Sequence, residues 1–187
     1  MANKVTRTLS EDEIVKIFRY LTIDVKQMLF LQLNTGLRIS DIILLKAKDI
    51  MFGKLEIKER KTGKPQLTRI NMDVVEYLFK NRVYDGEYMF WDEKCNPKSI
   101  IRKVEWQIQK ACDMENINSE FISTHSFRKT FATDAYNRTK DIVVVQELLN
   151  HSSAAVTQRY IRINKEKVDE TREKTAIGFK AIWKIML

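Results

Sequence analysis

A chain of 187 residues, 44% of them hydrophobic, can bury the core of one ordinary domain, and its five Gly and two Pro leave little sequence for linkers. The net charge of +8 favours a polyanionic partner such as nucleic acid, although a merely basic protein can have the same balance. Short aliphatic runs exclude a membrane-spanning helix, and the mixed apolar and acidic N-terminus excludes a signal peptide. Cys95 and Cys112 are too few for a disulfide framework and lack metal-ligand spacing, so we expect a single domain, residues 1–187, in the reducing cytoplasm.

Two helices are predicted at the start of the chain. Ser10 and Glu13 have the spacing of a capping box, so the first helix begins there. The second is expected to be capped by Asp24 and to end at Gly36, which can adopt the left-handed conformation that closes a helix. We expect the two helices to pack together through residues at helical spacing: Ile14, Phe18 and Leu21 in the first, and Val25, Met28, Leu29 and Leu33 in the second.

Arg38 lies in the sequence TGLRISD, directly ahead of a third predicted helix capped by Ser40. An arginine beside the free N–H groups of a helix N-terminus makes a strong phosphate-binding site. The alternative is a surface arginine that pairs with Asp41. Asp41 can also act indirectly, by holding Arg38 in position for a phosphate.

The segment from Gly53 to Ile70 changes from helical spacing to alternation, which predicts a β-hairpin. Leu55 and Ile57 belong to one strand and Leu67 to the other, with a turn at residues 61–64. The hairpin contains six basic residues: Lys54, Lys58, Arg60, Lys61, Lys64 and Arg69. Such lysines usually protect a sheet edge from pairing with another chain, but a basic hairpin also fits a DNA groove.

The middle of the chain is predicted to contain a short helix at residues 73–82, a brief strand from Tyr88 to Trp91, and a helix that starts at Asn96 and Pro97. The buried residues expected in that last helix are Ile100, Ile101, Val104, Ile108 and Ala111. On its other faces we expect three basic residues to be available to a partner: Arg102, Lys103 and Lys110.

Two more helices follow, beginning near Thr124 and after Asp141 as cap. His125 and Arg128 are three residues apart on the first, so both can meet the same anion. Asn150 is suited to a left-handed turn, which places His151 in that turn. The apolar residues expected to face inward are Phe127, Phe131 and Ala135 in the first helix and Val145, Leu148 and Leu149 in the second.

A last short helix, capped by Ser152 or Ser153, is expected before Tyr160. The tail from residue 165 to residue 187 begins charged and ends apolar. Its apolar residues lie on one helical face, which must dock on its own domain or on a neighbouring copy: Ile177, Ala181, Ile182 and Ile185.

Six residues together have the chemistry of a phosphoryl transfer without metal: Arg38, Lys61, His125, Arg128, His151 and Tyr160. Two arginines can neutralise the charge that develops on a phosphodiester in the transition state. A tyrosine becomes a good nucleophile once a histidine removes its proton, and a lysine can protonate the leaving 5′ oxygen. No carboxylate cluster for Mg²⁺ accompanies them, so we expect neither a metal nor any other cofactor. The energy of the broken bond is conserved in a phosphotyrosine, so resealing needs no ATP.

These motifs resemble the tyrosine recombinase, or phage integrase, family over nearly the entire chain. The matching sequences are TGLRISD around Arg38, KTGK around Lys61, HSFR from His125 to Arg128, and LNHSS followed by Tyr160. The resemblance implies the family's catalytic-domain fold, mainly α with a small antiparallel β-hairpin. It also implies a nucleoid-associated enzyme that exchanges strands of double-stranded DNA as a homo-tetramer and is a monomer or weak oligomer without DNA. Integration, excision and inversion of a phage or other mobile element remain open.

The resemblance also implies a role for each residue. Arg38 and Arg128 would hold the scissile phosphate, Lys61 would be the general acid, and His125 would assist as acid or base. His151 would hydrogen-bond a non-bridging oxygen, and Tyr160 would form the 3′-phosphotyrosine. Residues 164–187 would dock on the next subunit. Seven further residues are expected to contact DNA: Lys58, Arg60, Lys64, Arg69, Arg102, Lys103 and Lys129.

Three departures from the family pattern stand out. Phe127 replaces the usual Leu of the HxLR motif, a change within the apolar class, and Asn150 replaces the usual Gly. The N-terminal helical domain of most members is not in this sequence, which is either an excised catalytic domain or similar to the short fimbrial invertases. Two other functions remain open: a non-catalytic DNA-binding regulator on the same fold, and a nicking enzyme similar to a type IB topoisomerase.

Overall fold

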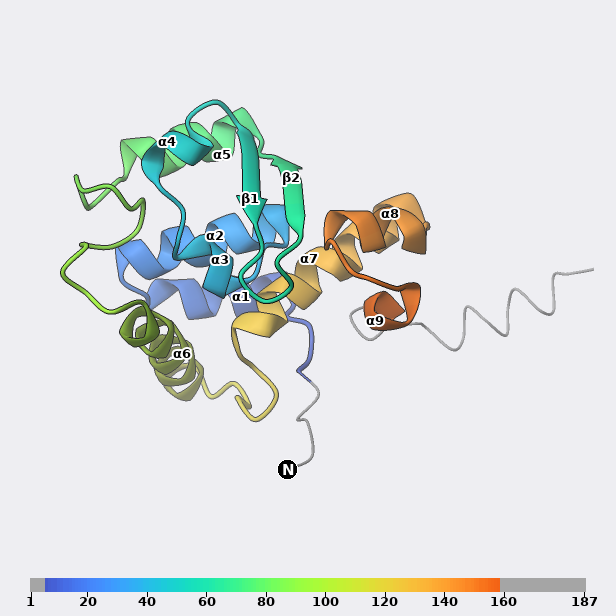
Figure 1. Cartoon of the computed structure of the whole chain (residues 1–187). Helices are drawn as coiled ribbons and strands as arrows, with labels where there is room; N and C mark the ends of the chain where they lie inside the picture. The colour runs from blue at the N-terminus through green and yellow to red at the C-terminus, as the bar shows by residue number, and fades with distance from the viewer. Residues whose placement is uncertain (1–5, 159–187) are drawn as a thin grey trace, which may run out of the picture.

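A computed structural model of the chain describes residues 6–158, which form a mainly helical domain with one two-stranded antiparallel sheet (Figure 1). This confirms the expected fold class. The elements in chain order are α1 (Glu11–Arg19), α2 (Ile23–Thr35), α3 (Ile39–Ile42), α4 (Ala47–Ile50), β1 (Lys54–Lys58), β2 (Pro65–Arg69), α5 (Met72–Lys80), α6 (Pro97–Met114), α7 (Thr124–Thr139), α8 (Ile142–Leu148) and α9 (Ala154–Gln158).

Several helix boundaries form as their local sequence predicts. Ser10 and Glu13 make both hydrogen bonds of a capping box at the start of α1. The side chains of Asn96 and Asp141 accept backbone N–H groups at the starts of α6 and α8. Gly36 ends α2 in the left-handed conformation, with φ of 67°. These caps and the closing glycine are confirmed. Each depends on residues that are close together in the sequence, so the local sequence was enough to predict it.

Two predicted caps are wrong. Thr22, not Asp24, precedes α2, and the buried Asp24 carboxylate instead accepts a 2.6 Å ion pair from Lys103 on α6. Arg38, not Ser40, holds the N-cap position of α3, so that helix starts two residues earlier than expected and is only four residues long. In the first case a tertiary ion pair replaced a local cap.

The hairpin forms with the expected turn, and its register pairs Ile57 with Gln66 and Glu56 with Leu67. Leu55 is fully buried, but on β2 the inward residue is Gln66, whereas Leu67 is 62% exposed. No strand forms over residues 88–91, where Tyr88 makes one isolated bridge to Lys46. Met89, Phe90 and Trp91 are nevertheless buried, and the Trp91 indole N–H donates to the Ile43 carbonyl at 2.5 Å. The apolar character of this segment therefore reflects core packing rather than a strand.

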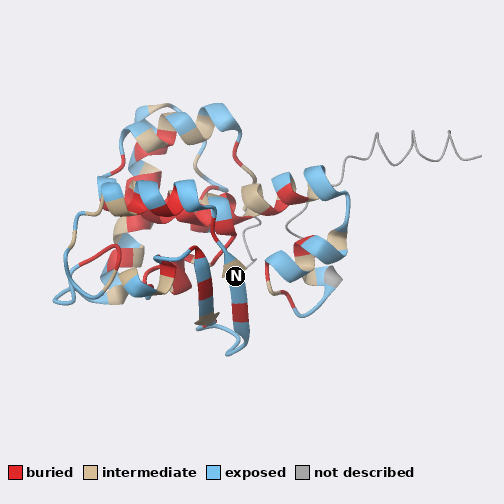
Figure 2. Ribbon diagram, turned by 90° about the horizontal axis from the view of Figure 1, so that it is seen from above, coloured by how far each residue is buried: buried red, intermediate tan, exposed pale blue. Residues whose placement is uncertain are grey.

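Two hydrophobic clusters hold the described residues together. The main cluster extends from Leu9 to Phe127, and within it α1 packs on α6 while α2 packs on α7, so the close pairing expected between α1 and α2 is not the principal contact. The second cluster consists of Ala132, Ala135, Val145 and Leu149, with Phe131, Tyr136 and Ile142 packed against it. Figure 1 shows α8 and α9 to one side of the larger body, joined to it through α7. In Figure 2 most of the buried residues lie in the larger body.

Helix α7 belongs to both clusters, because Phe127 packs in the first and Ala132 in the second. The inward positions expected in this part of the chain are confirmed for Phe127, Ala135, Val145 and Leu149, and Phe131 is partly buried. Leu148 was expected to point inward but is 40% exposed. None of the helices within residues 6–158 has the length and apolar character needed to cross a bilayer.

Candidate active site

Arg38 stands at the start of α3 with 13% of its side chain exposed, and its Nη1 donates to Oε1 of Glu59. The prediction that Asp41 holds Arg38 is therefore wrong. Asp41 is buried, and its Oδ1 accepts the backbone N–H of Arg60 at 3.0 Å, so it fixes the hairpin turn instead. Burial raises the pKa of Asp41, although the Arg60 bond and the charge of Arg38 oppose that shift.

Glu59 is the site residue that the sequence reasoning missed. It directly follows β1 and is 1% exposed, with its two carboxylate oxygens accepting from Arg38 and from the hydroxyl of Thr62. The signal was present in the sequence, because residues 55, 57 and 59 share one face of an extended strand. Leu55 and Ile57 point inward, so the alternation also placed Glu59 inward.

Lys61 is exposed in the turn between β1 and β2. The turn is closed by two backbone hydrogen bonds, from the Glu59 N–H to the Lys64 carbonyl at 2.9 Å and from the Gly63 N–H to the Glu59 carbonyl at 2.8 Å. The charge of Lys61 contributes to lowering the pKa of both His125 and His151. The turn thus brings Lys61 near both histidines.

Arg128 is fully buried in α7 and joins distant parts of the chain. Its guanidinium donates to the Gly36 carbonyl and, at 2.8 Å, to the Leu149 carbonyl. Its Nη2 also lies 3.2 Å from Nε2 of His151. His125 and Arg128 were expected to face the same anion. This is only partly confirmed, because His125 is exposed while Arg128 is buried.

His151 follows Asn150, whose φ of 51° confirms the left-handed turn. The ring is 7% exposed and its Nδ1 lies 3.1 Å from the Thr157 hydroxyl. Burial, followed by the charges of Arg128 and Arg38, lowers the pKa of His151 to about 4, so the ring is neutral at pH 7. Since a guanidinium only donates, Nε2 is the accepting nitrogen of the Arg128 pair and Nδ1 bears the proton.

His125 lies in the first turn of α7, where its backbone N–H donates to the Ser123 hydroxyl at 3.2 Å. Loss of water around the ring lowers its pKa, and the charges of Arg128, Lys61 and Arg38 lower it further. A histidine that is neutral near pH 7 is able to accept a proton. The lowered pKa is therefore compatible with a proton-transfer role.

Tyr160 lies outside the described residues, which end in α9 at Gln158. The tail, residues 164–187, also lies outside them. Five of the six predicted catalytic residues thus have a described position.

The seven basic residues predicted to contact DNA fall into two groups. Five are exposed: Lys58, Arg60, Lys64 and Arg69 on the hairpin, and Arg102 on α6. The other two already have protein partners, because Lys103 pairs with Asp24 and the Lys129 ammonium donates to the Thr6 carbonyl at 2.8 Å. Lys103 is therefore not free to face a partner as expected. Across residues 6–158 no group of three His, Cys, Asp or Glu side chains is placed to hold a metal ion.

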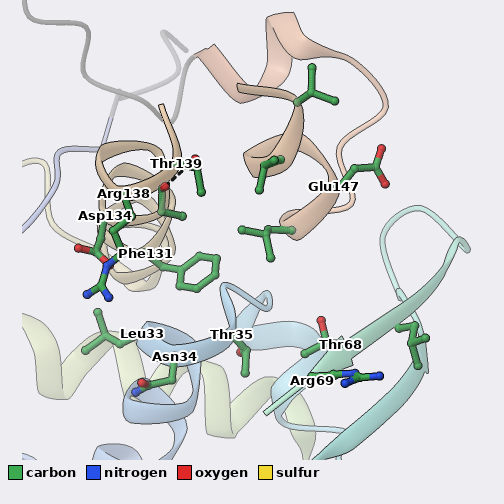
Figure 3. A pocket seen from close by; sticks show the side chains of 15 residues that line it. Leu33, Asn34, Thr35, Thr68, Arg69, Phe131, Asp134, Arg138, Thr139 and Glu147 are labelled. Carbon is green, nitrogen blue, oxygen red and sulfur yellow. Dashed lines mark hydrogen bonds and ion pairs between the residues drawn. The ribbon is translucent and has the colours of Figure 1, made fainter. Parts of the chain in front are cut away.

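A groove of about 860 Å³ lies between the ends of α2 and α7, strand β2 and helix α8 (Figure 3). Its apolar lining includes Leu67, Val143 and Leu148, which are 62%, 58% and 40% exposed. Charged side chains also line it, among them Arg69, Glu147 and the Asp134–Arg138 ion pair at 2.8 Å. Leu148, which was expected to point inward, thus forms part of an open surface together with Leu67.

The chain was compared with known proteins. A family model described as "Phage integrase family" matches residues 7–167. The probable integrase/recombinase YoeC of Bacillus subtilis is 35% identical over 169 residues, which cover 84% of this chain and 89% of YoeC. The tyrosine recombinase XerA of Pyrococcus horikoshii is 30% identical over 179 residues, covering 91% of this chain and 62% of that protein.

Among solved structures, a lambda integrase dimer bound to a COC′ core site superimposes with a TM-score of 0.69 at 21% identity. The match covers 87% of this chain and 49% of the integrase chain. The similarity confirms the fold of the domain. The chain spans most of the length of YoeC but only about three-fifths of XerA.

Proposed function

This chain belongs to the phage integrase family of tyrosine recombinases, and from that premise we propose that it cleaves and rejoins double-stranded DNA at specific sites through a 3′-phosphotyrosine intermediate. The attacking oxygen is that of Tyr160, and the broken bond is the one between phosphorus and the 5′ oxygen. The proton that the 5′ oxygen requires comes from Lys61, and neither a metal nor ATP takes part.

One observation supports this function above the others, namely the convergence of Arg38, Arg128, His151 and the Lys61 turn. The four positions come from the start of α3, α7, the α8–α9 connection and the hairpin. Arg128 contacts His151 directly, and the charges of Arg38 and Lys61 lower the pKa of that histidine. Two guanidinium groups beside a neutral histidine suit a phosphodiester whose charge increases during the reaction. A lysine at the edge of that site suits protonation of the leaving oxygen.

The test uses Tyr160→Phe and a suicide duplex. The duplex is enriched from a randomised library by binding to the chain and is then nicked so that cleavage releases a short strand and traps the adduct. Wild type should form a covalent adduct that survives denaturation, and Tyr160→Phe should form none, because the nucleophilic oxygen is missing. Tyr77→Phe, at a ring packed against Phe30 on α2, is the matched control and should behave as wild type. An adduct that persists in Tyr160→Phe would refute the assignment.

The two other functions predict different results in the same assay. A regulator on the same fold binds DNA in a salt-sensitive way but forms no adduct with any duplex, and Tyr160→Phe leaves its binding unchanged. A topoisomerase-like enzyme relaxes any supercoiled plasmid without a specific site. The complete set of six motif residues favours the recombinase, because a regulator needs none of the tyrosine chemistry.

We also propose that copies assemble on DNA by placing the tail, residues 164–187, of one copy in the groove of the next. The groove of Figure 3 presents Leu67, Val143 and Leu148 to solvent. The segment beyond the described residues has a complementary apolar face at helical spacing, made of Ile177, Ala181, Ile182 and Ile185. As the family resemblance implies, we propose a homo-tetramer as the full assembly.

Assembly on the selected duplex can be measured by light scattering. Deleting residues 174–187, or changing Leu148→Glu, should leave the complex with fewer protein copies per duplex. Met114→Glu, at an apolar position on α6 that is 57% exposed against 40% for Leu148, is the control and should leave assembly unchanged. If the deletion lowers thermal stability without altering assembly, the segment docks on its own domain and the proposal is wrong.

A further inference from the structure

Glu59 links two parts of the candidate site that are far apart in sequence. Its side chain is fully enclosed, with Oε1 accepting from Nη1 of Arg38 and Oε2 accepting from the hydroxyl of Thr62. Arg38 is a predicted phosphate ligand, and Thr62 is the neighbour of the predicted proton donor, Lys61. One carboxylate therefore connects the position of the phosphate ligand to the turn of the proton donor.

The backbone around Glu59 closes the same turn. Its N–H and carbonyl bond to the Lys64 carbonyl and the Gly63 N–H, at 2.9 and 2.8 Å. On the other side of Lys61, the Arg60 N–H donates to Asp41 of α3 at 3.0 Å. Both neighbours of Lys61 are thus fixed to α3, Arg60 directly through Asp41 and Thr62 through Glu59 and Arg38.

An acidic residue at this place needs an explanation. A carboxylate beside a phosphate-binding arginine reduces the local positive charge and repels DNA, so Glu59 does not serve DNA affinity. A proton donor, by contrast, must lie within hydrogen-bonding distance of the oxygen it protonates, and a lysine side chain on an unrestrained turn samples many positions. Fixing the turn relative to Arg38 limits where the Lys61 ammonium can be.

We propose that Glu59 is a positioning residue that places Lys61 at the leaving oxygen of the phosphate bound by Arg38. The inference rests on the proposed function, because Lys61 has a proton to donate only if DNA is cleaved. In that step the Tyr160 hydroxyl gives its proton to His125 and its oxygen bonds to phosphorus, while the bond from phosphorus to the 5′ oxygen breaks. The 5′ oxygen takes up the proton of Lys61 Nζ. Glu59 itself takes no part in the bond changes.

The test compares two forms of the selected suicide duplex, after the scissile bond has been mapped with wild type. One form has the normal 5′ oxygen at that bond and the other has sulfur. A thiolate leaves without a proton, so the sulfur duplex does not need the general acid. Lys61→Ala should lose cleavage of the oxygen duplex and recover it with sulfur, whereas Arg38→Ala should be defective with both.

Glu59→Ala should show the same pattern as Lys61→Ala, namely slower cleavage of the oxygen duplex and recovery with the sulfur duplex. We expect single-turnover cleavage of the oxygen duplex to fall about 10- to 100-fold, within the usual contribution of a general acid, and the sulfur duplex to be cleaved within about threefold of wild type. The half-saturating DNA concentration should stay the same or fall, because a negative charge is removed. Glu59→Gln, which retains one acceptor oxygen, should show a smaller loss and serves if the alanine variant folds poorly.

Glu56→Ala is the matched control, because Glu56 is an exposed carboxylate of β1 that faces Leu67 rather than the site. It should leave cleavage of both duplexes unchanged. Equal losses with oxygen and sulfur in Glu59→Ala and Glu59→Gln, or no loss with either, would overturn the inference while leaving the proposed function intact. A wild-type chain that forms no adduct with either duplex would overturn the proposed function, and the inference with it.

Discussion

The two hydrophobic clusters support different halves of the candidate site, and they differ in size. The main cluster extends from α1 to the start of α7 and includes Ile39 and Ile42 of α3 and Leu55 of β1, so it supports Arg38 and the hairpin. Within residues 6–158 the second cluster has only four buried residues, and it supports the end of α8 and therefore His151. Because hydrophobic stabilisation grows with the buried apolar area, the second cluster stabilises the His151 half of the site less than the main cluster stabilises the Arg38 half.

The difference suggests a division between a fixed half and a more easily displaced half. Arg38, Glu59 and Asp41 join α3 to the hairpin through buried groups. The hydrogen bonds that join the smaller half to the larger one include those from Arg128 to carbonyls of both halves and one from the Gln66 amide to the Leu148 carbonyl at 3.2 Å. The junction of the two clusters is therefore where changes should have the largest effects.

Gly36→Ala should break this junction. At φ of +67° a Cβ atom would lie 2.5 Å from Cε1 of Phe131 and 3.0 Å from Cδ2 of Leu149, both in the second cluster. The left-handed conformation costs a non-glycine residue about 1–2 kcal/mol and the overpacking a further 1–3 kcal/mol. We expect the free energy of unfolding, measured with urea, to fall by about 3–4 kcal/mol.

Gly86→Ala is the control for that loss. Gly86 has no positive φ, and the nearest atom to its added Cβ is Oε1 of Glu93 at an ordinary 3.5 Å. The change should lie within about 0.5 kcal/mol of wild type. A Gly36→Ala chain as stable as Gly86→Ala would mean that the two clusters are not tightly packed against each other.

Leu149→Ala and Leu78→Ala sharpen the comparison of the two halves, because both leucines are fully buried and lie in different clusters. Each should lower the free energy of unfolding by about 3 kcal/mol through the lost contacts and the cavity. Only Leu149→Ala should also reduce adduct formation, by tenfold or more. The backbone carbonyl of Leu149 accepts a hydrogen bond from Arg128, and Leu149 lies two residues before His151, so a shift of this backbone would displace both site residues. Equal effects of the two changes on adduct formation, at a temperature where both variants are folded, would remove the distinction between the halves.

The protonation of His151 should weaken the smaller half in acid. Its pKa is lowered to about 4 from an ordinary 6.5, so the unfolded chain binds the proton more readily than the folded one. This contribution to stability is fully present above pH 6.5 and is lost as the pH falls toward 4, with a total on the order of 3 kcal/mol.

The measurement is the free energy of unfolding of wild type and His151→Gln between pH 7 and pH 5. Asp41, whose raised pKa has the opposite sign, is present in both chains, so the difference between them isolates His151. His125→Gln, at a ring whose pKa is also lowered, should remove a separate part of the pH dependence. An unchanged slope in His151→Gln would show that the ring is not held neutral by its surroundings.

The sequence was sufficient where the determining contacts are local. The capping box of Ser10 and Glu13, the cap of α8 at Asp141 and the closing Gly36 depend on hydrogen bonds and backbone conformations within a few residues. The motifs around Arg38, Lys61 and His151 were recognisable for a similar reason, since each is a short segment with a fixed spacing. Their convergence was inferred from the family resemblance, not from spacing.

The sequence was insufficient where a distant partner decides. Asp24 is a plausible helix cap until Lys103, on α6, is placed beside it. Asp41 is a plausible partner for Arg38 until Glu59, which follows β1, takes that position. Leu67 and Leu148 look like core residues because of their apolar character, yet they border the open groove of Figure 3.

Asn150 is a local prediction that was confirmed, and it allows the smallest test of the His151 half. Its φ of 51° places it in the left-handed region, and its side chain donates to the Pro65 carbonyl at 3.2 Å. Asn150→Ala should cost about 1 kcal/mol, because alanine tolerates this conformation poorly and the bond to β2 is lost. Asn150→Gly removes the same bond but adopts the conformation freely, so its free energy of unfolding should stay within about 0.5 kcal/mol of wild type. If glycine proves as costly as alanine, the turn before His151 depends on the bond to the hairpin rather than on its backbone conformation, and the two halves are joined more firmly than the cluster sizes indicate.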